Sequence, residues 1–471
     1  MTQDGSNNQQ NHLEFVEVIP VVRKYDWGKR ENTALTKIYS KNLGLLNEDN
    51  DEPYAELWYG SHVSNPSTVK YTSNTCKTDT NKMNTSVTLD DIIINKFKGV
   101  YKKKLPFLLK ILSISKPLSL QVHPDVNLAK ELNLRYPEIY PDDNHKPEIA
   151  IALTEFEAFC GFQTTPSIIS NIKEYPEIHD LFGYDGVDNS EPVEDPNFEI
   201  RKELFVNTFL FQQNNGCCPP SSDLNKQEQL LTKLIDRLKN TKYEERTISE
   251  NLILRLNEHY PLDIGILSPL LLNYYKLKPG DAIFIGPGTI HSYISGECIE
   301  CMANSDNVIR CGLTPKHKDV NTLIKAVNFQ KNCCKIIYNT NDSLVPSSPS
   351  NHIHDYGIKC VDEYHIKTID IDEYYINNCK DGNGDVLELN THSYSPTLLI
   401  TISLGGSNNC NDSNDNGSYQ HRDYHVYLNN KKIDLFPGKS LLIDSEVNIK
   451  FPKPLEDKQN KHIVALVSIP N

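Results

Sequence analysis

The stretch Leu118-Ser119-Leu120-Gln121-Val122-His123-Pro124-Asp125 alternates apolar and polar side chains. Side chains of a strand point alternately to its two faces, so Ser119, Gln121 and His123 are expected to share one face. The stretch follows a strongly apolar run at residues 105–112. A strand that turns a hydroxyl, an amide and an imidazole inward is typical of a binding site. A half-buried strand with one solvated face is the simpler interpretation, and partners elsewhere in the chain decide between the two.

Composition limits the classes of protein to consider. The chain has 471 residues, 38% of them hydrophobic, which predicts two or three domains. No apolar run reaches transmembrane length, and the polar residues 1–13 are expected to form a disordered tail, so we expect a cytoplasmic protein that does not contact membranes. The twelve cysteines are diluted in a long chain and are expected to be reduced. The net charge of -14, without a basic block, argues against nucleic-acid binding.

Helical and strand signals are segregated along the chain. Residues 166–261 carry helical patterns, including one apolar stripe of Leu231, Leu234, Ile235 and Leu238, and Ser249 is expected to cap the helix that follows. Strand patterns precede and follow this region. The sequence therefore predicts a mainly β protein with an inserted helical module. Polar segments at about 72–87, 213–226, 339–352 and 406–418 are interpreted as surface insertions.

A weak internal repeat suggests two related β-barrels. Lys278-Pro279-Gly280-Asp281 and Phe436-Pro437-Gly438-Lys439 both place Pro and Gly as a type II turn requires, and each precedes an apolar strand. His291 lies eleven residues after Gly280, and Ile449 lies eleven residues after Gly438. We therefore expect the second barrel to lack the chemistry of the first.

Two more stretches supply polar partners for the opening strand. Glu148 stands at the start of a predicted buried strand at 149–153, and His291 lies within the segment 286–302. If Ser295-Gly296 forms a two-residue hairpin turn, Glu300 lies opposite His291 on one face. This arrangement would place an acid/base group beside a ligand-type histidine.

Gln121, His123, Glu148 and His291 together form a set of nitrogen and oxygen ligands. Two imidazoles and a carboxylate suit Zn²⁺, Fe²⁺ or Mn²⁺, and the Gln oxygen can complete the protein shell. Basic residues occur in the same segments and favour an anionic substrate such as a sugar phosphate. These residues are Lys110, Lys146, Arg310 and Lys316.

Three motifs carry a family resemblance. They are Gln-Val-His-Pro at 121–124, Asp-Asp-Asn-His-Lys-Pro-Glu at 142–148 and Ser-Asp-Asn-Val-Ile-Arg-Cys-Gly-Leu-Thr at 305–314. With these motifs the chain resembles the type I phosphomannose isomerases over about residues 14–330, and more weakly beyond. It departs from the family pattern at Ile290, where many members have Pro, and at Tyr59, where many have Met.

The resemblance implies a cupin architecture with two jelly-roll barrels and a helical insertion. The zinc-binding barrel would comprise 14–164 and 265–335, the helical domain 165–264, and a second barrel without metal 336–471. It also implies one Zn²⁺ per chain, bound by Gln121, His123, Glu148 and His291, with Arg310 as the catalytic arginine.

The activity that the resemblance implies is interconversion of mannose 6-phosphate and fructose 6-phosphate through a cis-enediol, feeding mannose 1-phosphate and GDP-mannose synthesis. A base must move the proton, and the sequence leaves Glu300, Asp306, His145 and Lys146 open as candidates. Three further residues are candidates for substrate or phosphate contact: Ser119, Lys110 and Lys316. We expect a monomer.

Two other functions remain open at this point. One is a metal cupin of another class, such as an Fe²⁺-dependent oxygenase, which would not need Arg310 and the lysines. The other is a sugar-binding cupin without catalytic activity, an interpretation that suits the second barrel better than the first.

Overall fold

The computed structural model describes most of the chain, namely residues 12–46, 51–70, 87–183, 198–210, 222–329, 334–338, 353–371, 386–391, 395–405, 424–452 and 460–470. The expected tail, except its last two residues, lies outside these ranges, as do nearly all residues of the expected polar insertions. The insertion expected at 213–226 was wrong at its C-terminal end, because residues 222–226 form the start of a long helix.

The described chain is mainly β with a helical insertion, as the sequence predicted. It divides into two compact units: a first unit of residues 1–112, 299–303 and 339–471, and a second unit of residues 113–298 and 304–338. The domain limits expected from the sequence cut the chain differently and stay a prediction. No helix within the described ranges is both long enough and apolar enough to cross a lipid bilayer.

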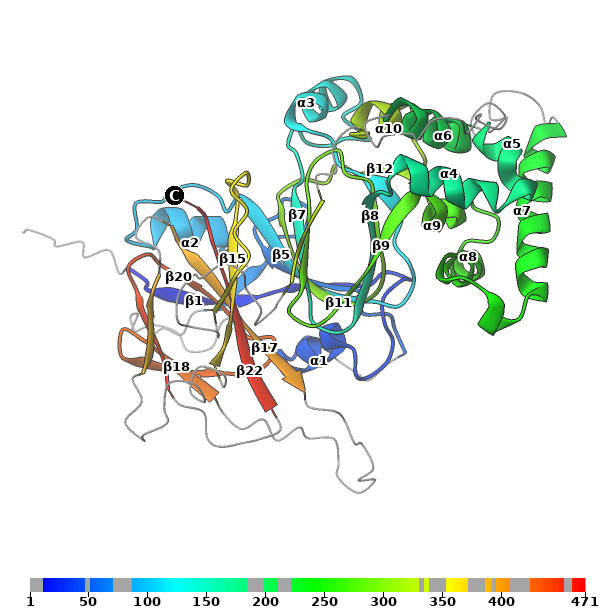
Figure 1. The fold of residues 1–471 in the computed structure, drawn as a ribbon. Helices are drawn as coiled ribbons and strands as arrows, with labels where there is room; N and C mark the ends of the chain where they lie inside the picture. The colour runs from blue at the N-terminus through cyan, green and yellow to red at the C-terminus, as the bar shows by residue number, and fades with distance from the viewer. Residues whose placement is uncertain are drawn as a thin grey trace, which may run out of the picture. The chain divides into compact units, whose positions relative to one another are not determined.

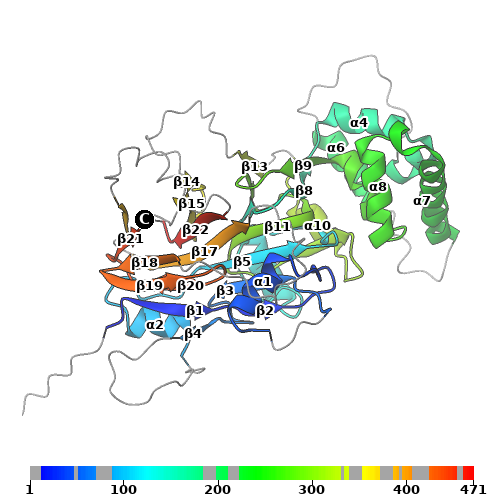
Figure 2. The same ribbon diagram turned by 90° about the horizontal axis from the view of Figure 1, so that it is seen from below.

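Two antiparallel sheets form most of the first unit (Figure 2). The seven-stranded sheet has the order β14 (Ile353–Asp355), β15 (His365–Asp370), β22 (Asn460–Ser468), β17 (Thr397–Gly405), β20 (Ser440–Ile443), β1 (Phe15–Ile19) and β4 (Thr68–Lys70). The four-stranded sheet has the order β16 (Leu387–Asn390), β21 (Asn448–Phe451), β18 (Tyr424–Leu428) and β19 (Lys431–Leu435). We call these two sheets the C-terminal barrel. One apolar core joins them, with Leu399 and Leu441 from the first and Val426 and Ile449 from the second.

The remaining elements of the first unit come from the N-terminal part of the chain. They are β2 (Val21–Arg23), α1 (Leu35–Asn42), β3 (Glu56–Gly60), α2 (Leu89–Asn95) and most of β5 (Phe107–Ile114). β2 pairs with β3, and β3 pairs with β5. β1 pairs with β20, so the first strand of the chain belongs to the sheet of its last strands.

The second unit contains the barrel that carries the metal-ligand candidates, which we call the metal barrel. Its strands are β6 (Leu120–Val122), β7 (Glu148–Ala152), β8 (Phe156–Phe162), β9 (Leu272–Leu277), β10 (Ala282–Ile285), the first part of β11 (His291–Ala303), β12 (Ile309–Gly312) and β13 (Cys334–Ile337). On one side of this barrel, β10 pairs with both β7 and β13. On the other side, β11 pairs with β6 and β8, which pair in turn with β12 and β9. Figure 1 shows β7 and β8 on opposite sides of this barrel.

The helical insertion packs on the β6 and β8 side of the metal barrel (Figure 1). Its principal helices are α4 (Thr165–Lys173), α5 (His179–Phe182), α6 (Phe198–Leu210), α7 (Ser222–Asn240), α8 (Ile248–His259) and α9 (Ser268–Leu271). The stripe predicted at 231–238 is buried in one core with Leu120 and Phe159 of the barrel. Two helices outside the insertion complete the unit: α3 (Val126–Arg135) and α10 (Val320–Ala326).

The cap expected for α8 was wrong by two residues. Thr247 precedes the helix, its hydroxyl accepts from the Glu250 backbone N–H at 3.1 Å, and the Glu250 carboxylate accepts from the Thr247 N–H at 2.9 Å. This is a capping box, which the Thr-x-x-Glu pattern of the sequence would have indicated.

The hairpin expected at Ser295-Gly296 was also wrong. β11 runs as one strand from His291 to Ala303, and Ser295 pairs with Glu157 of β8 next to an irregularity in the register. Gly296 has φ +108°, and a Cβ on it would lie 2.4 Å from the Glu155 carbonyl oxygen. Gly296 therefore allows a bend within β11. Since β11 is one continuous strand, His291 and Glu300 are not cross-strand partners.

Candidate metal centre

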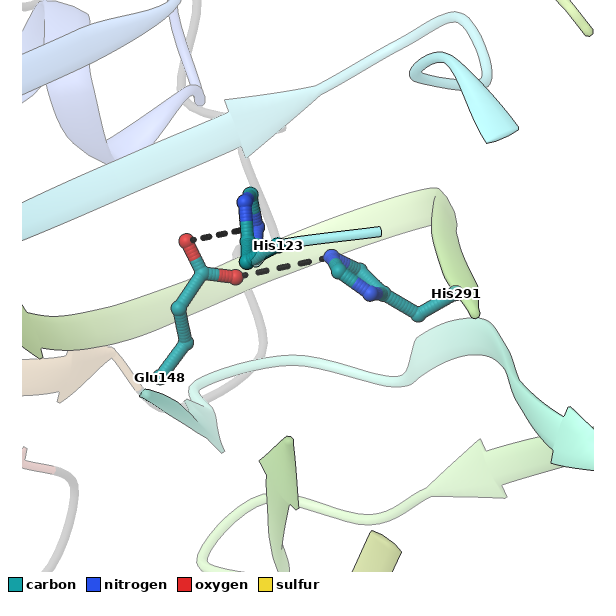
Figure 3. Close-up of side chains that lie close together, drawn as sticks. All are labelled: His123, Glu148 and His291. Atoms are coloured by element: carbon teal, nitrogen blue, oxygen red, sulfur yellow. Dashed lines mark ion pairs between the residues drawn. The ribbon is translucent and has the colours of Figure 1, made fainter. Parts of the chain in front are cut away.

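Three strands bring the candidate ligands together (Figure 3). His123 directly follows β6, Glu148 opens β7 and His291 opens β11. His291 pairs in register with Gln121, which also pairs with Arg310 of β12. Figure 3 shows the Glu148 carboxylate directed at both imidazoles, with one oxygen toward each ring.

The distances within this group suit a single ion. His123 Nε2 lies 3.4 Å from one Glu148 oxygen, and His291 Nε2 lies 3.5 Å from the other. Ligand atoms about 2.0–2.1 Å from a tetrahedral zinc lie about 3.3 Å from one another. All three side chains are nearly inaccessible, with 1–2% of their surface exposed. The group is therefore shielded from solvent and already has the spacing of a metal-ligand set.

Backbone carbonyls orient both imidazoles. His123 Nδ1 donates to the Asn307 carbonyl oxygen at 2.8 Å, and His291 Nδ1 donates to the Thr289 carbonyl oxygen at 2.9 Å. Each ring then carries Nε2 as its acceptor nitrogen, which is how metal-binding histidines are commonly held. His123 Nε2 is buried and has no hydrogen-bond partner among the residues that the structure describes. A buried orphan acceptor of this kind fits the role of a metal ligand.

The electrostatics keep His123 and Glu148 in their metal-binding forms. Burial lowers the pKa of His123 to about 4, although the nearby Glu148 acts in the opposite direction. Burial alone would raise the pKa of Glu148, but Lys146 and the two histidines hold that pKa well below its usual range. At neutral pH His123 is therefore neutral and Glu148 is ionised, as metal coordination requires.

Lys146 and Ser119 lie beside this group. Lys146 is buried, and its Nζ lies 3.2 Å from Glu148. The Gln121 amide nitrogen lies 3.4 Å from His291 Nε2, while its oxygen accepts from the Ser119 hydroxyl at 2.8 Å. The sequence placed Gln121 and Ser119 on one strand face, and here they share a hydrogen bond.

Arg310 lies on β12, next to Gln121 in the sheet. Its guanidinium is partly buried, and burial lowers the pKa of Arg310 against the opposing effect of Tyr140. The Tyr140 hydroxyl donates to the Asp319 carboxylate at 2.9 Å. No carboxylate within the described ranges forms an ion pair with Arg310, so its charge is available to an anionic ligand.

Three other predicted residues lie in the same unit but are more exposed. His145 is half-buried, and its backbone N–H donates to the Asn144 side chain at 3.0 Å. Asp306 and Lys316 have exposed side chains. Their predicted roles, proton transfer for His145 and Asp306 and substrate contact for Lys316, stay predictions.

Lys110 and Glu300 belong to the first unit. They form a buried ion pair with a separation of 2.9 Å, and the Lys110 ammonium lies 5.2 Å from the centre of the Trp58 ring. Each charge therefore has a partner within its own unit. Their predicted roles in substrate contact and proton transfer stay predictions.

Sequence reasoning missed the residues that support the ligands. Asn307 and Thr289 act on the imidazoles through main-chain carbonyls, and no side-chain pattern signals a carbonyl contact. Asp142 accepts hydrogen bonds from the segment that contains Asn307. Both Asp142 and Asn307 stand in the motifs quoted above, but their side chains alone do not suggest this role.

Two imidazoles and a carboxylate, buried within a β-barrel in a chain that also contains a second barrel, define a cupin with a candidate metal centre. Comparison with known proteins narrows this class. The family model for the catalytic domain of type I phosphomannose isomerase matches residues 15–165, and the model for its helical insertion domain matches residues 221–272.

Individual relatives agree with the family models. Mannose-6-phosphate isomerase 2 of Arabidopsis thaliana is 38% identical over 314 residues, which cover 66% of this chain and 70% of that protein. A probable mannose-6-phosphate isomerase of Caenorhabditis elegans is 32% identical over 82% of this chain and 83% of its own. A solved mannose 6-phosphate isomerase bound with zinc and yttrium superposes with a TM-score of 0.68 at 25% identity, covering 98% of this chain and 100% of that one. The chain belongs to the type I phosphomannose isomerase family, whose members are aldose–ketose isomerases.

Proposed function

We propose that this protein interconverts mannose 6-phosphate and fructose 6-phosphate in a zinc-dependent reaction through a cis-enediol. The observation that carries the proposal is the buried His123–Glu148–His291 group, with Arg310, which has no ion-pair partner among the described residues, on a neighbouring strand. The reaction moves one proton between C1 and C2 while charge develops on O1 and O2. It therefore needs electrophilic groups near those oxygens and an acid/base group near the carbons.

Zinc suits the donor set of His123, Glu148 and His291, and one ion per chain would use all three. The relative bound with zinc supports this choice of metal. Gln121 is the fourth proposed ligand. Turning its amide over would direct the oxygen to the side of His291 Nε2, where both atoms could serve as ligands, and leave the NH₂ group to donate to the Ser119 hydroxyl. When bound, the ion would supply Lewis-acid polarisation of the sugar oxygens.

The chain's own residues would perform the remaining steps. Arg310 would stabilise the negative charge of the enediolate, because Arg310 is the register partner of Gln121 on the neighbouring strand and has no competing carboxylate among the described residues. Lys146, whose ammonium already lies 3.2 Å from Glu148, would donate to a substrate oxygen at the same place. Lys146 is also one of the four proton-transfer candidates, and it contacts the ligand group through Glu148.

The product would serve synthesis of mannose 1-phosphate and GDP-mannose, the metabolic role that the family resemblance implies. We propose a location in the cytoplasm, which such a role would suit.

A coupled isomerase assay tests the proposal. Purified protein is assayed with mannose 6-phosphate as isolated, after treatment with a chelator, and after zinc is returned. Activity that disappears with the chelator and returns with zinc is the expected result. Full activity in the metal-free protein would refute the role of zinc, and no activity under any metal loading would refute the isomerase. Oxygen consumption with Fe²⁺ added would instead indicate the oxygenase class.

A further inference from the structure

The segment that holds His123 in place has no regular secondary structure of its own. Residues 304–308 connect β11 to β12 without strand or helix hydrogen bonds, yet the Asn307 carbonyl accepts the hydrogen bond from His123 Nδ1 at 2.8 Å. An irregular connection positions a ring accurately only if other contacts immobilise it.

Asp142 supplies most of those contacts. One carboxylate oxygen accepts from the Ser305 hydroxyl at 2.8 Å and from the Asn307 amide at 3.0 Å, and the other accepts from the Asp306 backbone N–H at 2.7 Å. The same carboxylate accepts from the Asn144 backbone N–H at 3.1 Å. A single carboxylate thus collects four donors, three of them from residues 305–307.

The Asn307 side chain adds hydrogen bonds to main-chain carbonyls of the segment that contains Asp142. Its amide nitrogen donates to the Asp142 carbonyl at 2.8 Å and to the Asn144 carbonyl at 3.0 Å, in addition to the Asp142 carboxylate. Asn307 is completely buried and Ser305 is 1% exposed, so water has little access to these two side chains. Three oxygen neighbours around one nitrogen also fix which way the amide faces.

We propose that Asp142 and Asn307 are positioning residues for the metal centre, an inference that rests on the proposed binding of zinc. Together they join the segment that leads into Glu148 to the segment that orients His123. Asp142 lies six residues before Glu148, and Asn307 provides the carbonyl on His123. The two side chains therefore set the separation of an imidazole ligand from the carboxylate ligand without contacting the ion.

Asp142→Asn tests this role, and Asp143→Asn is the matched control. The amide nitrogen that the first substitution introduces would face donors that now bond to a carboxylate oxygen, so the 305–307 segment should loosen. Asp143 is exposed and makes no hydrogen bond or ion pair with any residue that the structure describes. Zinc affinity of each metal-free variant is measured by competition with a chromogenic chelator, and its thermal unfolding is recorded without metal.

Loss of an outer-sphere partner of a metal ligand commonly weakens metal binding by about 10–100-fold. We expect this loss for Asp142→Asn, with zinc affinity unchanged in Asp143→Asn and with both metal-free variants folded. If Asp142→Asn does not fold, Ser305→Ala removes one donor to Asp142 and is expected to weaken zinc binding several-fold. Equal zinc affinity in a folded Asp142 or Ser305 variant and in the natural protein would overturn the proposal. Zinc binding by the natural protein without isomerase activity would instead refute the proposed function alone.

Discussion

The turn at Gly280 in the metal barrel and the turn at Gly438 in the C-terminal barrel have the same backbone but lead to different residues. Gly280 has φ +89° and Gly438 has φ +91°. In each turn the next backbone N–H donates to the carbonyl three residues earlier, at 2.9 Å. Both predicted turns are thus confirmed, and each leads into a buried strand, β10 or β20.

Eleven residues after each glycine the two barrels diverge. His291 points its Nε2 at Glu148 in one, whereas Ile449 packs in the apolar core between two sheets in the other. The strand scaffold therefore does not create the site. The difference lies in which side chains the strands direct inward, and in whether buried polar groups find partners there.

The largest effect is expected when His291 of the metal barrel is replaced by isoleucine, the residue found at position 449 of the C-terminal barrel. His291→Ile should fold, because isoleucine suits a buried strand position, but it removes a ligand outright. Since losing an outer partner alone costs about 10–100-fold, zinc affinity and isomerase activity should each fall by more than about 100-fold. Zinc titration and the coupled assay measure both. A variant that keeps zinc but loses activity would show that His291 acts in some other way.

Substitution of Arg310 should affect catalysis but not metal binding by the metal barrel. Arg310→Ala should reduce turnover by about 10²–10³-fold, the usual loss when one preorganised electrostatic donor is removed. Zinc content should not change, because the guanidinium is not part of the ligand group. Arg310→Lys keeps the charge without the planar fork and is expected to lose less. Parallel loss of zinc and turnover in Arg310→Ala would contradict this separation.

Acid should destabilise the metal-free metal barrel through His123. The folded-state pKa of about 4 lies below the ordinary value of 6.5, so the unfolded chain binds the proton more tightly. The stability from burying a neutral ring is therefore complete above pH 6.5 and is lost as the pH falls to about 4, up to about 3 kcal/mol. Thermal unfolding of metal-free natural protein and His123→Leu measures this. An equal decline in both proteins would exclude His123 as the cause.

The reverse substitution, in the C-terminal barrel, should lower the stability of the protein only modestly. Ile449→His places an imidazole in an apolar core and is expected to destabilise the protein by about 1–3 kcal/mol, the usual effect of an unsatisfied buried polar group. It should not create a second zinc site, because one imidazole does not form a ligand set. Chemical denaturation and zinc stoichiometry measure the two effects, and a second equivalent of bound zinc would contradict the account.

Local sequence patterns predicted what depends on local periodicity. The stripe at 231–238, the buried strand after Glu148 and the two Pro-Gly turns follow from spacing alone, and the structure contains all of them. The meeting of His123, Glu148 and His291 depends on strand pairing over long distances in sequence. It was anticipated from residue chemistry and the family resemblance rather than from geometry.

The failures have physical reasons of their own. A glycine beside Ser295 satisfies a hairpin turn and a strand bend equally well, so sequence alone did not distinguish them. The Asp142 and Asn307 contacts were missed because four of the six hydrogen bonds that their side chains make among the described residues involve main-chain atoms, which every residue carries. Long-range main-chain contacts leave no residue-specific signal.

The central claim is that one zinc ion bound by the metal barrel makes the protein an isomerase. Its most direct test is a titration of the metal-free protein with zinc while isomerisation of mannose 6-phosphate is followed in the same sample. Activity should rise in proportion to added zinc and stop rising at one equivalent per chain. Activity already complete before zinc is added, or a saturating stoichiometry other than one, would contradict the claim.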